Sequence, residues 1–269
     1  MGQRKIKERI VNHMTKFDNH KIIWIDSIDS TNNEVKRNID TFDNLSVLAT
    51  YEQTSGRGQR GNIWLAETGM NLTFSIVIKY EQMQVRLKAA DQFDISEITA
   101  LSVIELLSEN EIEAKIKWPN DIYVGDKKIC GILIEHSSRG ERLSYSIIGV
   151  GLNVNQVVFE SSLPNPTSMC QCIPTPVSHL NLDLLLVRFM DIFVGYLQKM
   201  LSGDCVRDSY LSKLWRFGEI SKFCTYDMQG AHEFTGRICG LTETGKILIE
   251  DCDTHTLMDF GFKEVGYII

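Results

Sequence analysis

Most of the chain up to residue 217 shows the two periodicities of regular secondary structure. Apolar residues spaced three and four apart predict helices, whereas short apolar or alternating runs predict strands, whose side chains point to opposite faces in turn. Helices are expected at 95–107, 182–201 and 206–215. Strands are expected at 22–25, 46–50, 71–78, 114–124, 128–136 and 143–154.

Turn residues separate the last three of these strands. Gly125-Asp126 and Ser138-Arg139-Gly140 have the chemistry of tight turns, so we expect an antiparallel meander rather than a βαβ series.

Two helix starts are also predicted nearer the N-terminus. Residues 1–9 have the pattern of a short amphipathic helix. A second helix is expected to open at Ser30, with Thr31 and Glu34 spaced as a capping box.

The pattern changes after Phe217. Short strand-like runs separated by Gly and Asp turns continue to the C-terminus, as in a small β-barrel. They lie around Cys224 and at 236–239, 246–249, 256–258 and 265–268. The sequence therefore predicts an α+β domain over residues 1–217, with a mixed or antiparallel sheet and helices, and a small all-β domain over 218–269.

Composition and charge argue against several classes of protein. The 269 residues are 43% hydrophobic and 23% charged, as in an ordinary soluble enzyme. A net charge of -7 disfavours non-specific binding to nucleic acid. No apolar run reaches the roughly 18 to 20 residues that a membrane helix needs, and no signal-peptide core is visible, so we expect a cytoplasmic protein. Seven scattered cysteines predict reduced thiols.

The segment Gly56-Arg57-Gly58-Gln59-Arg60-Gly61 is rich in glycine and arginine and lies in a loop expected at 53–64. Glycines let a backbone wrap closely around a ligand, and arginines donate to phosphate or carboxylate. The segment lacks the Lys-Ser/Thr ending of a Walker loop and the strand–helix context of a dinucleotide site. The alternative is a flexible exposed loop whose arginines are incidental.

The segment Lys117-Trp118-Pro119-Asn120-Asp121 lies within the strand-like run 114–124. Pro119 interrupts the hydrogen-bond ladder of a strand. The basic Lys117, the amide of Asn120 and the carboxylate of Asp121 then project close together. Lys117 can bind phosphate, and Asn120 and Asp121 can bind hydrated Mg²⁺. The alternative is a kinked edge strand with a solvated bend.

Glycines occur inside two further strands. Lys128 stands at the entry of an apolar strand that contains Gly131, and Gly149 and Gly151 interrupt the next one. A glycine within a strand marks a close approach of ligand or backbone. Asn153 has both donor and acceptor groups, which suit a nucleobase or ribose. The alternatives are a turn lysine with a packing glycine, and a β-bulge.

In this order and spacing, the four segments resemble the biotin–protein ligase family, from about Ile22 to the C-terminus. The resemblance implies a catalytic domain similar to class II aminoacyl-tRNA synthetases and a C-terminal SH3-like β-barrel. It implies an enzyme that forms biotinyl-5'-AMP from biotin and ATP with Mg²⁺. The biotin then passes to a lysine of a biotin carboxyl carrier protein, a domain of a biotin-dependent carboxylase.

The resemblance also implies roles for individual residues. Lys128, Arg57 and Lys117 are the expected catalytic residues. The expected biotin-binding residues are Ser30, Thr31, Asn32, Gln53, Gly56, Arg57, Lys128, Gly131, Ile132, Gly149 and Gly151. The expected nucleotide-binding residues are Arg57, Gln59, Arg60, Trp64, Lys117, Asn120 and Asn153, and the expected metal ligands are Asn120 and Asp121.

The chain departs from the family pattern in three places. Gln59 stands where many members have arginine, and Asn62 also replaces a common arginine. If that arginine retains the adenylate, this chain holds it less tightly or uses Arg60 instead. Lys263 stands where glycine is usual, and the final Gly-Tyr-Ile-Ile lacks a basic residue that some members place near the nucleotide.

Two other functions fit parts of the same sequence pattern. A lipoate–protein ligase or octanoyl transferase has a similar catalytic fold, but its Arg-Arg…Gly-Gly-Gly and His-Asp signatures are missing. A non-catalytic regulator would bring a DNA-binding domain, and about thirty residues before Ser30 are too few for one. We therefore expect no DNA or membrane partner, while an exposed sheet edge leaves a homodimer open.

Overall fold

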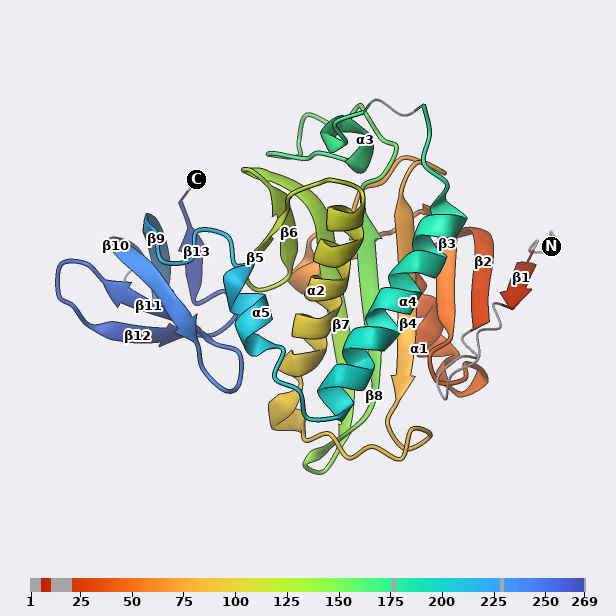
Figure 1. The fold of residues 1–269 in the computed structure, drawn as a ribbon, viewed down its shortest axis with the longest axis horizontal. Helices are drawn as coiled ribbons and strands as arrows, with labels where there is room; N and C mark the ends of the chain where they lie inside the picture. Colours follow the sequence, from red (N-terminus) through yellow and green to blue (C-terminus); the bar gives the residue numbers. More distant parts are fainter. Residues whose placement is uncertain (1–5, 11–20, 176–177, 228–229, 269) are drawn as a thin grey trace.

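Two separate sheets organise the chain (Figure 1). The structure is a computed structural model and describes residues 6–10, 21–175, 178–227 and 230–268. The larger sheet has eight strands in the order β1-β2-β3-β4-β8-β7-β6-β5. It is mixed, because β2 and β3 are parallel and the other neighbours are antiparallel. Its strands are β1 (Ile6–Ile10), β2 (Lys21–Ile28), β3 (Val47–Gln53), β4 (Leu72–Lys79), β5 (Lys115–Lys117), β6 (Asp121–Val124), β7 (Lys127–Arg139) and β8 (Arg142–Leu152).

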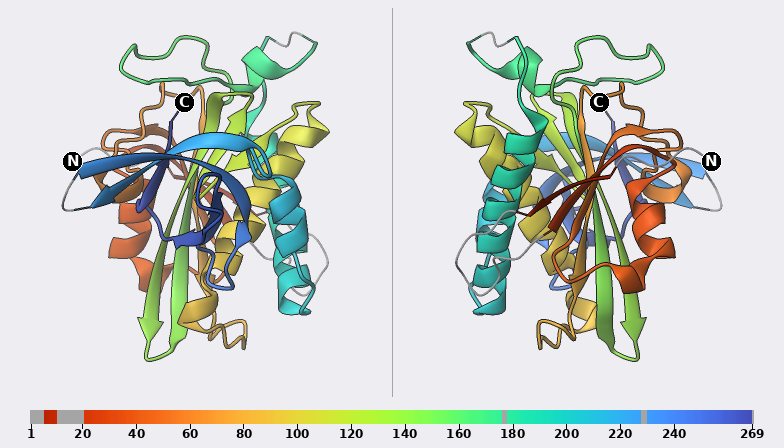
Figure 2. Two further views of the ribbon diagram at one scale, coloured as in Figure 1. Left: turned by 90° about the vertical axis from the view of Figure 1, so that its left-hand side faces the viewer. Right: turned by 90° about the vertical axis from the view of Figure 1, so that its right-hand side faces the viewer.

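Helices cover both faces of this sheet (Figure 2). The long helices α2 (Phe93–Glu109) and α4 (Leu182–Leu201) pack on one face and on each other, and α1 (Thr31–Arg37) packs on the other. Strand β4 is buried along its length except at Lys79, and its polar residues Thr73 and Ser75 are buried with the apolar ones. The remaining helical segments are α3 (Met169–Cys172), α5 (Arg207–Ser212) and the 3-10 turns Ile39–Thr41, Gln59–Gly61 and Ala89–Asp91.

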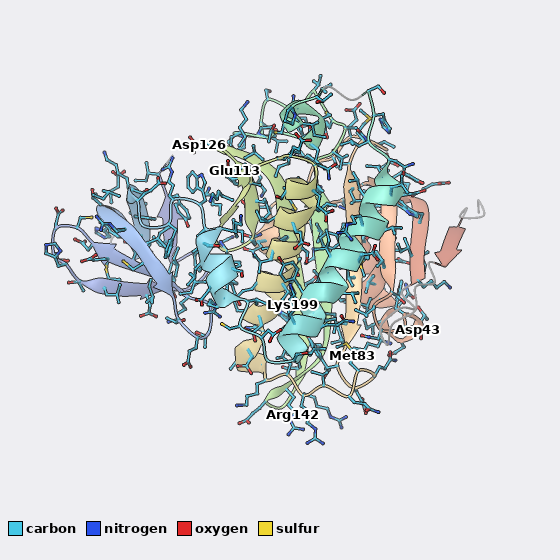
Figure 3. The ribbon with its side chains drawn as sticks, in the orientation of Figure 1. Asp43, Met83, Glu113, Asp126, Arg142 and Lys199 are labelled. Carbon is cyan, nitrogen blue, oxygen red and sulfur yellow. The ribbon has the colours of Figure 1, made fainter. Side chains whose placement is uncertain are left out.

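The β7–β8 hairpin forms the centre of the sheet. In Figure 3, Asp126, before β7, lies toward the top of the view, and Arg142, at the start of β8, lies at the bottom. Side chains along β7 alternate between the two faces of the sheet. Glu135 bonds to Asn32 of α1, whereas His136 bonds to Ser146 and lies near the start of α2.

The C-terminal sheet has five antiparallel strands in the order β12-β11-β10-β9-β13 and lies beside the β5–β6 edge of the larger sheet (Figure 1). Its strands are β9 (Ile220–Asp227), β10 (Gly230–Leu241), β11 (Ile247–Asp251), β12 (Leu257–Phe260) and β13 (Val265–Tyr267).

Two contacts fix the β10–β11 turn against the helices and the β5–β6 turn. Arg207 of α5 forms an ion pair with the buried Glu97 of α2 and donates to the carbonyl of Thr242 at 2.7 Å. The indole of Trp118 donates to the carbonyl of Gly245 at 3.0 Å. The two sheets are therefore held together next to the segment 117–121.

The predicted α+β fold with a small C-terminal β-sheet is confirmed. All seven cysteines are free, as expected. The boundary at residue 217 stays a prediction, although it falls between the last helix and β9. Within the described residues, no helix is long and apolar enough to span a membrane.

Three local predictions are wrong. The run 114–124 is a hairpin of β5 and β6 rather than one strand, because Pro119 has no N–H for the ladder and stands at the turn. Residues 6–10 form β1, which pairs with the edge of β2, whereas residues 1–5 lie outside the described part. Ser30 is the N-cap of α1 and Thr31 makes no capping bond, because its hydroxyl donates to Gln53 instead.

Candidate active site

A cavity of about 470 Å³ lies on the α1 face of the eight-stranded sheet. Its walls come from the start of α1, the segment 53–64, the β5–β6 turn, the paired middle of β7 and β8, and the end of the five-stranded sheet. Most residues predicted for the site line it together: Ser30, Thr31, Asn32, Gln53, Arg57, Gln59, Trp64, Lys117, Asn120, Asp121, Lys128, Gly131, Ile132, Gly149 and Gly151.

One end of the cavity has a polar, uncharged wall. Gln53 Oε1 accepts from Thr31 N at 2.9 Å and from Thr31 Oγ1 at 3.2 Å. Ser75 Oγ lies 2.7 Å from Thr31 Oγ1 and 2.6 Å from Asn32 Oδ1. Ser30, Thr31, Asn32 and Ser75 are all buried, so this network fixes donors and acceptors in place out of bulk water.

Asn32 lies directly against the sheet. Its Nδ2 donates to Leu133 O at 3.2 Å and to Glu135 Oε2 at 3.0 Å. A Cβ on Gly149 would stand 2.5 Å from Asn32 Oδ1, closer than any side chain tolerates. Glycine in β8 is therefore required for the polar wall to form.

Glu135 also ties the glycine-rich segment to α1. Arg57 Nη1 lies 3.2 Å from Glu135 Oε2 and donates to Asn33 Oδ1 at 2.7 Å, and Lys36 Nζ lies 3.2 Å from Glu135 Oε1. Burial alone would raise the pKa of Glu135, but Asn32, Arg57 and Lys36 together hold it below its usual range. The carboxylate is therefore ionised and holds Arg57 at the cavity wall.

The indole of Trp64 lies against the glycines of β7 and β8. A Cβ on Gly151 would overlap the indole ring, so the close approach requires glycine. Trp64 N donates to Gly56 O at 3.0 Å, which closes the loop upon itself. Trp64 Nε1 is buried and has no hydrogen-bond partner among the described residues, so it is a donor available to a ligand.

Lys128 and Asp121 form an ion pair at the mouth of the β6–β7 hairpin. Lys128 Nζ lies 2.6 Å from Asp121 Oδ1 and 5.8 Å from the centre of the Trp64 ring. The neighbouring Asn120 donates its amide to Ile132 O at 2.8 Å, so its side-chain oxygen stays available.

One carboxylate and one amide oxygen form a small donor set for a cation. Mg²⁺ commonly takes one or two carboxylates and completes its shell with water and substrate phosphate, so Asn120 and Asp121 fit a hydrated Mg²⁺ that a phosphate shares. No group of three or more His, Cys, Asp or Glu side chains able to hold a metal occurs in the part of the chain that the structure describes.

Lys117 stands in a cage of three aromatic rings. Its Nζ lies 4.7 Å from the Tyr123 ring centre, 5.6 Å from that of Trp215 and 5.3 Å from that of Tyr267, and it donates to Tyr123 Oη at 3.1 Å. Cation–π contacts stabilise the ammonium without neutralising it. Lys117 therefore brings a fixed positive charge to the cavity.

The five-stranded sheet also lines the cavity, through Lys263, Val265, Gly266 and Tyr267. The sequence predictions assigned none of these residues to the site. The one available signal was Lys263 at a position where glycine is usual.

Two of the predicted residues do not line the cavity. Gly56 lines another pocket instead, and its carbonyl accepts a hydrogen bond from Trp64 N. Asn153 is buried, and its amide donates to Thr167 O at 2.9 Å, so it supports the loop after β8. The side chain of Arg60 is outside the described residues.

Comparison with known proteins gives consistent matches. Residues 24–153 match the model of the biotin/lipoate A/B protein ligase family. The bifunctional ligase/repressor BirA of Escherichia coli is 28% identical over 151 residues, which are 56% of this chain and 46% of BirA. Biotin–protein ligase 1, chloroplastic, of Arabidopsis thaliana is 33% identical over 137 residues, which are 50% of this chain and 36% of that protein.

Among solved structures, the biotin protein ligase from Aquifex aeolicus in complex with biotin and ATP superposes with a TM-score of 0.73. The two chains are 25% identical, and the superposition covers 91% of this chain and 97% of that one. The curated relatives are matched over less: the chain spans under half the length of the Escherichia coli and Arabidopsis proteins.

Proposed function

We propose that this chain, which belongs to the biotin protein ligase family, forms biotinyl-5'-AMP from biotin and ATP and transfers the biotin to a specific lysine of a biotin carboxyl carrier protein. The observation that carries the proposal is the division of the cavity. One end is a neutral wall of donors and acceptors, and the rest presents Arg57, Lys117 and Lys128. A ligand with an uncharged polar head and an anionic tail matches this arrangement.

The neutral wall suits the bicyclic ring of biotin. A cyclic urea has one strong acceptor and two N–H donors, and Ser30, Thr31 and Asn32 offer both kinds of partner in a buried place. Gly149 and Gly151 let Asn32 and the Trp64 indole lie directly against the sheet, where they shape the wall of the cavity. Tight complementarity of this kind favours one ring system over others.

The cationic part suits the first chemical step. A carboxylate oxygen of biotin attacks the α-phosphorus of ATP, and pyrophosphate leaves with the electron pair of the broken P–O bond. Two anions must meet, so positioning and neutralisation of charge by Lys128, Arg57 and Lys117 are the main contributions of the protein. A Mg²⁺ held by Asn120 and Asp121 would add charge neutralisation at the phosphates.

The segment 53–64 is placed to protect the product. It already lies over the β7–β8 floor through Trp64 and is fixed to α1 through Arg57. Over a bound mixed anhydride, this loop would exclude water. In the second step, the amine of the carrier lysine attacks the acyl carbon, AMP leaves, and an amide forms.

The carrier, the cytoplasmic location and any homodimer belong to this proposal. A lysine within a biotin-dependent carboxylase subunit has the required amine. The net charge of the chain, -7, does not favour DNA as a partner.

Transfer to a carrier domain tests the proposal. The full chain is incubated with MgATP, a biotin carboxyl carrier domain and biotin, and the mass of the carrier is followed. We expect a gain of one biotinyl group that requires ATP, and no gain when the acceptor lysine is replaced by arginine. Labelling with lipoate or octanoate in place of biotin would instead support the lipoate–protein ligase or octanoyl transferase alternative.

A further inference from the structure

The β10–β11 turn is linked to the segment 117–121 by a hydrogen bond. The buried indole of Trp118 donates to Gly245 O at 3.0 Å. Trp118 follows Lys117 directly, and all five residues of the segment line the cavity. A shift of the turn would therefore reach the cavity wall through Trp118, because coupling between distant groups passes along such packed and bonded contacts.

The turn itself packs tightly against α2 and α5. Gly245 has a φ of 84°, and a Cβ at this position would overlap the ring of Phe93 at the start of α2. The ring of Phe93 in turn packs edge-on against Tyr210 of α5, with 5.7 Å between the ring centres. In Figure 1, α5 lies between α2 and the five-stranded sheet, so the two helices together form the surface on which the turn rests.

Arg207 of α5 contacts the turn and α2 at the same time. Its Nη1 donates to Thr242 O at 2.7 Å, and its Nη2 donates to Glu243 O at 3.3 Å. Its Nε forms an ion pair with Glu97, and Asp94 Oδ1 lies 4.0 Å from its Nη2. A planar guanidinium can serve several partners in fixed directions, whereas a single ammonium cannot.

The ion pair of Arg207 and Glu97 contributes little to stability by itself. Glu97 is 2% exposed, and burial raises its pKa to about 7 although Arg207 opposes the shift. Apolar residues of similar volume often replace such a buried pair without loss of stability. Apolar residues could not donate to the carbonyls of the turn, however, so the pair is better explained by the orientation that it gives to Arg207.

We propose that Arg207 is a positioning residue for the proposed reaction. Oriented by Glu97, it fixes the β10–β11 turn, and the turn holds the segment 117–121 in place through Trp118. The proposal rests on the proposed function, because the groups expected to bind phosphate and Mg²⁺ belong to that segment. Arg207 does not line the cavity, so it acts on the reaction through the turn.

Two substitutions break this connection at its two ends. Arg207→Lys keeps a positive charge beside Glu97 but cannot reach both carbonyls of the turn, and Trp118→Phe keeps an aromatic ring but lacks the N–H. At about pH 8, where Glu97 is ionised, we expect each variant to lower kcat/KM for MgATP about tenfold. The double variant should lose little more than either single one, because both changes break the same connection.

Binding of biotin gives an internal reference, since the neutral wall of the cavity contains none of these residues. Its Kd, measured by calorimetry, should stay within about twofold of the wild type in all three variants. The matched control is Arg188→Lys, which makes the same change in the ion pair of Arg188 and Glu109 between α4 and α2. It should leave kcat/KM for MgATP unchanged.

Three results would overturn the proposal. Losses that multiply in the double variant would show two independent effects. A Kd for biotin that weakens as much as kcat/KM for MgATP falls would reduce Arg207 to general support of the fold. An equal loss of kcat/KM in Arg188→Lys would show that the β10–β11 turn is not involved.

Hydrogen exchange followed by mass spectrometry separates this inference from the proposed function, because it requires no substrate. In Arg207→Lys, we expect faster exchange in residues 115–124 and in the turn, and unchanged exchange in β8. If the wild type fails to use biotin but shows this pattern, the proposed function fails and the positioning role stands. If biotin is used and exchange in 115–124 is unchanged, or rises equally in β8, the positioning role fails and the proposed function stands.

Discussion

The ammonium of Lys128 and the carboxylate of Asp121 lie 2.6 Å apart, although Lys128 is the second residue of β7 and Asp121 begins β6. The antiparallel β6–β7 pairing brings them together across the turn that contains Gly125. Asp121 thus holds Lys128 in one orientation at the cavity, and the same carboxylate is the strongest candidate for a metal ligand.

Replacement of Asp121 by Asn should lower kcat for adenylate formation about 100-fold, because Lys128 loses its fixed orientation and Mg²⁺ loses a ligand. The Mg²⁺ concentration for half-maximal rate should rise. Initial rates across a Mg²⁺ titration give both quantities. Asp126→Asn, in the same hairpin but exposed and outside the cavity, is the control and should keep both values. An Asp121→Asn enzyme with an unaltered kcat would contradict the assignment.

Gly149→Ala should weaken biotin binding at least tenfold, since the new methyl group would displace Asn32 from the polar wall. The KM for ATP should change far less. Gly195→Ala is the control: nothing lies within 4 Å of its Cβ position in α4, and alanine there should raise the unfolding free energy by about 0.5–1 kcal/mol. Kinetics with varied biotin, and thermal unfolding of both variants, check this prediction. A normal KM for biotin in Gly149→Ala would exclude the polar wall from the ring site.

Gln59→Arg tests the departure in the glycine-rich segment. Gln59 lines both the main cavity and a smaller adjoining pocket of about 170 Å³. An arginine there would add a donor for the phosphate of the adenylate, so we expect release of biotinyl-5'-AMP to slow about tenfold. The release rate is measured by chasing a preformed, labelled complex with excess unlabelled biotin and ATP. An equal or faster release in the variant would show that Gln59 does not set retention of the intermediate.

His136 gives a prediction for the dependence of stability on pH. Burial lowers the pKa of His136 to about 4 from an ordinary value of 6.5. As the pH falls from 7 to 5, the unfolded chain takes up a proton that the folded protein does not, so stability falls by up to about 2 kcal/mol from this group.

His136→Asn keeps a partner for Ser146 and removes the titration, so the variant should lose less stability than the wild type over this range. Urea unfolding at pH 7 and pH 5 gives the comparison. Equal losses in the two proteins would indicate that His136 is not the group responsible.

Sequence patterns identified most of the fold because burial has a clear periodicity in this chain. Helix α4 has the predicted bounds, and the meander of β6, β7 and β8 follows from its turn residues. The hairpin at Pro119 was missed because, over a run as short as 114–124, a single strand and a tight hairpin have similar patterns of apolar residues. Strand β1 was missed because pairing with the edge of β2 overrides a local helical pattern.

The site was predictable to the extent that glycines and charges cluster in the sequence. Lys128 and Gly151 stand out because a charged residue and a glycine do not stabilise the packing of the apolar strands that contain them. The role of Tyr267 could not be predicted, because it depends on how the second sheet docks against Lys117. Likewise, no local pattern pairs Glu135 with Arg57 across 78 positions of the chain.

The most direct test of the account is biotin-dependent exchange of labelled pyrophosphate into ATP, measured with the wild type and with Lys128→Met. The account predicts exchange that requires biotin and Mg²⁺ and that falls at least 100-fold in Lys128→Met without loss of folded structure, because Lys128 neutralises the meeting anions. Exchange that proceeds equally without biotin, or at an unchanged rate in Lys128→Met, would contradict it.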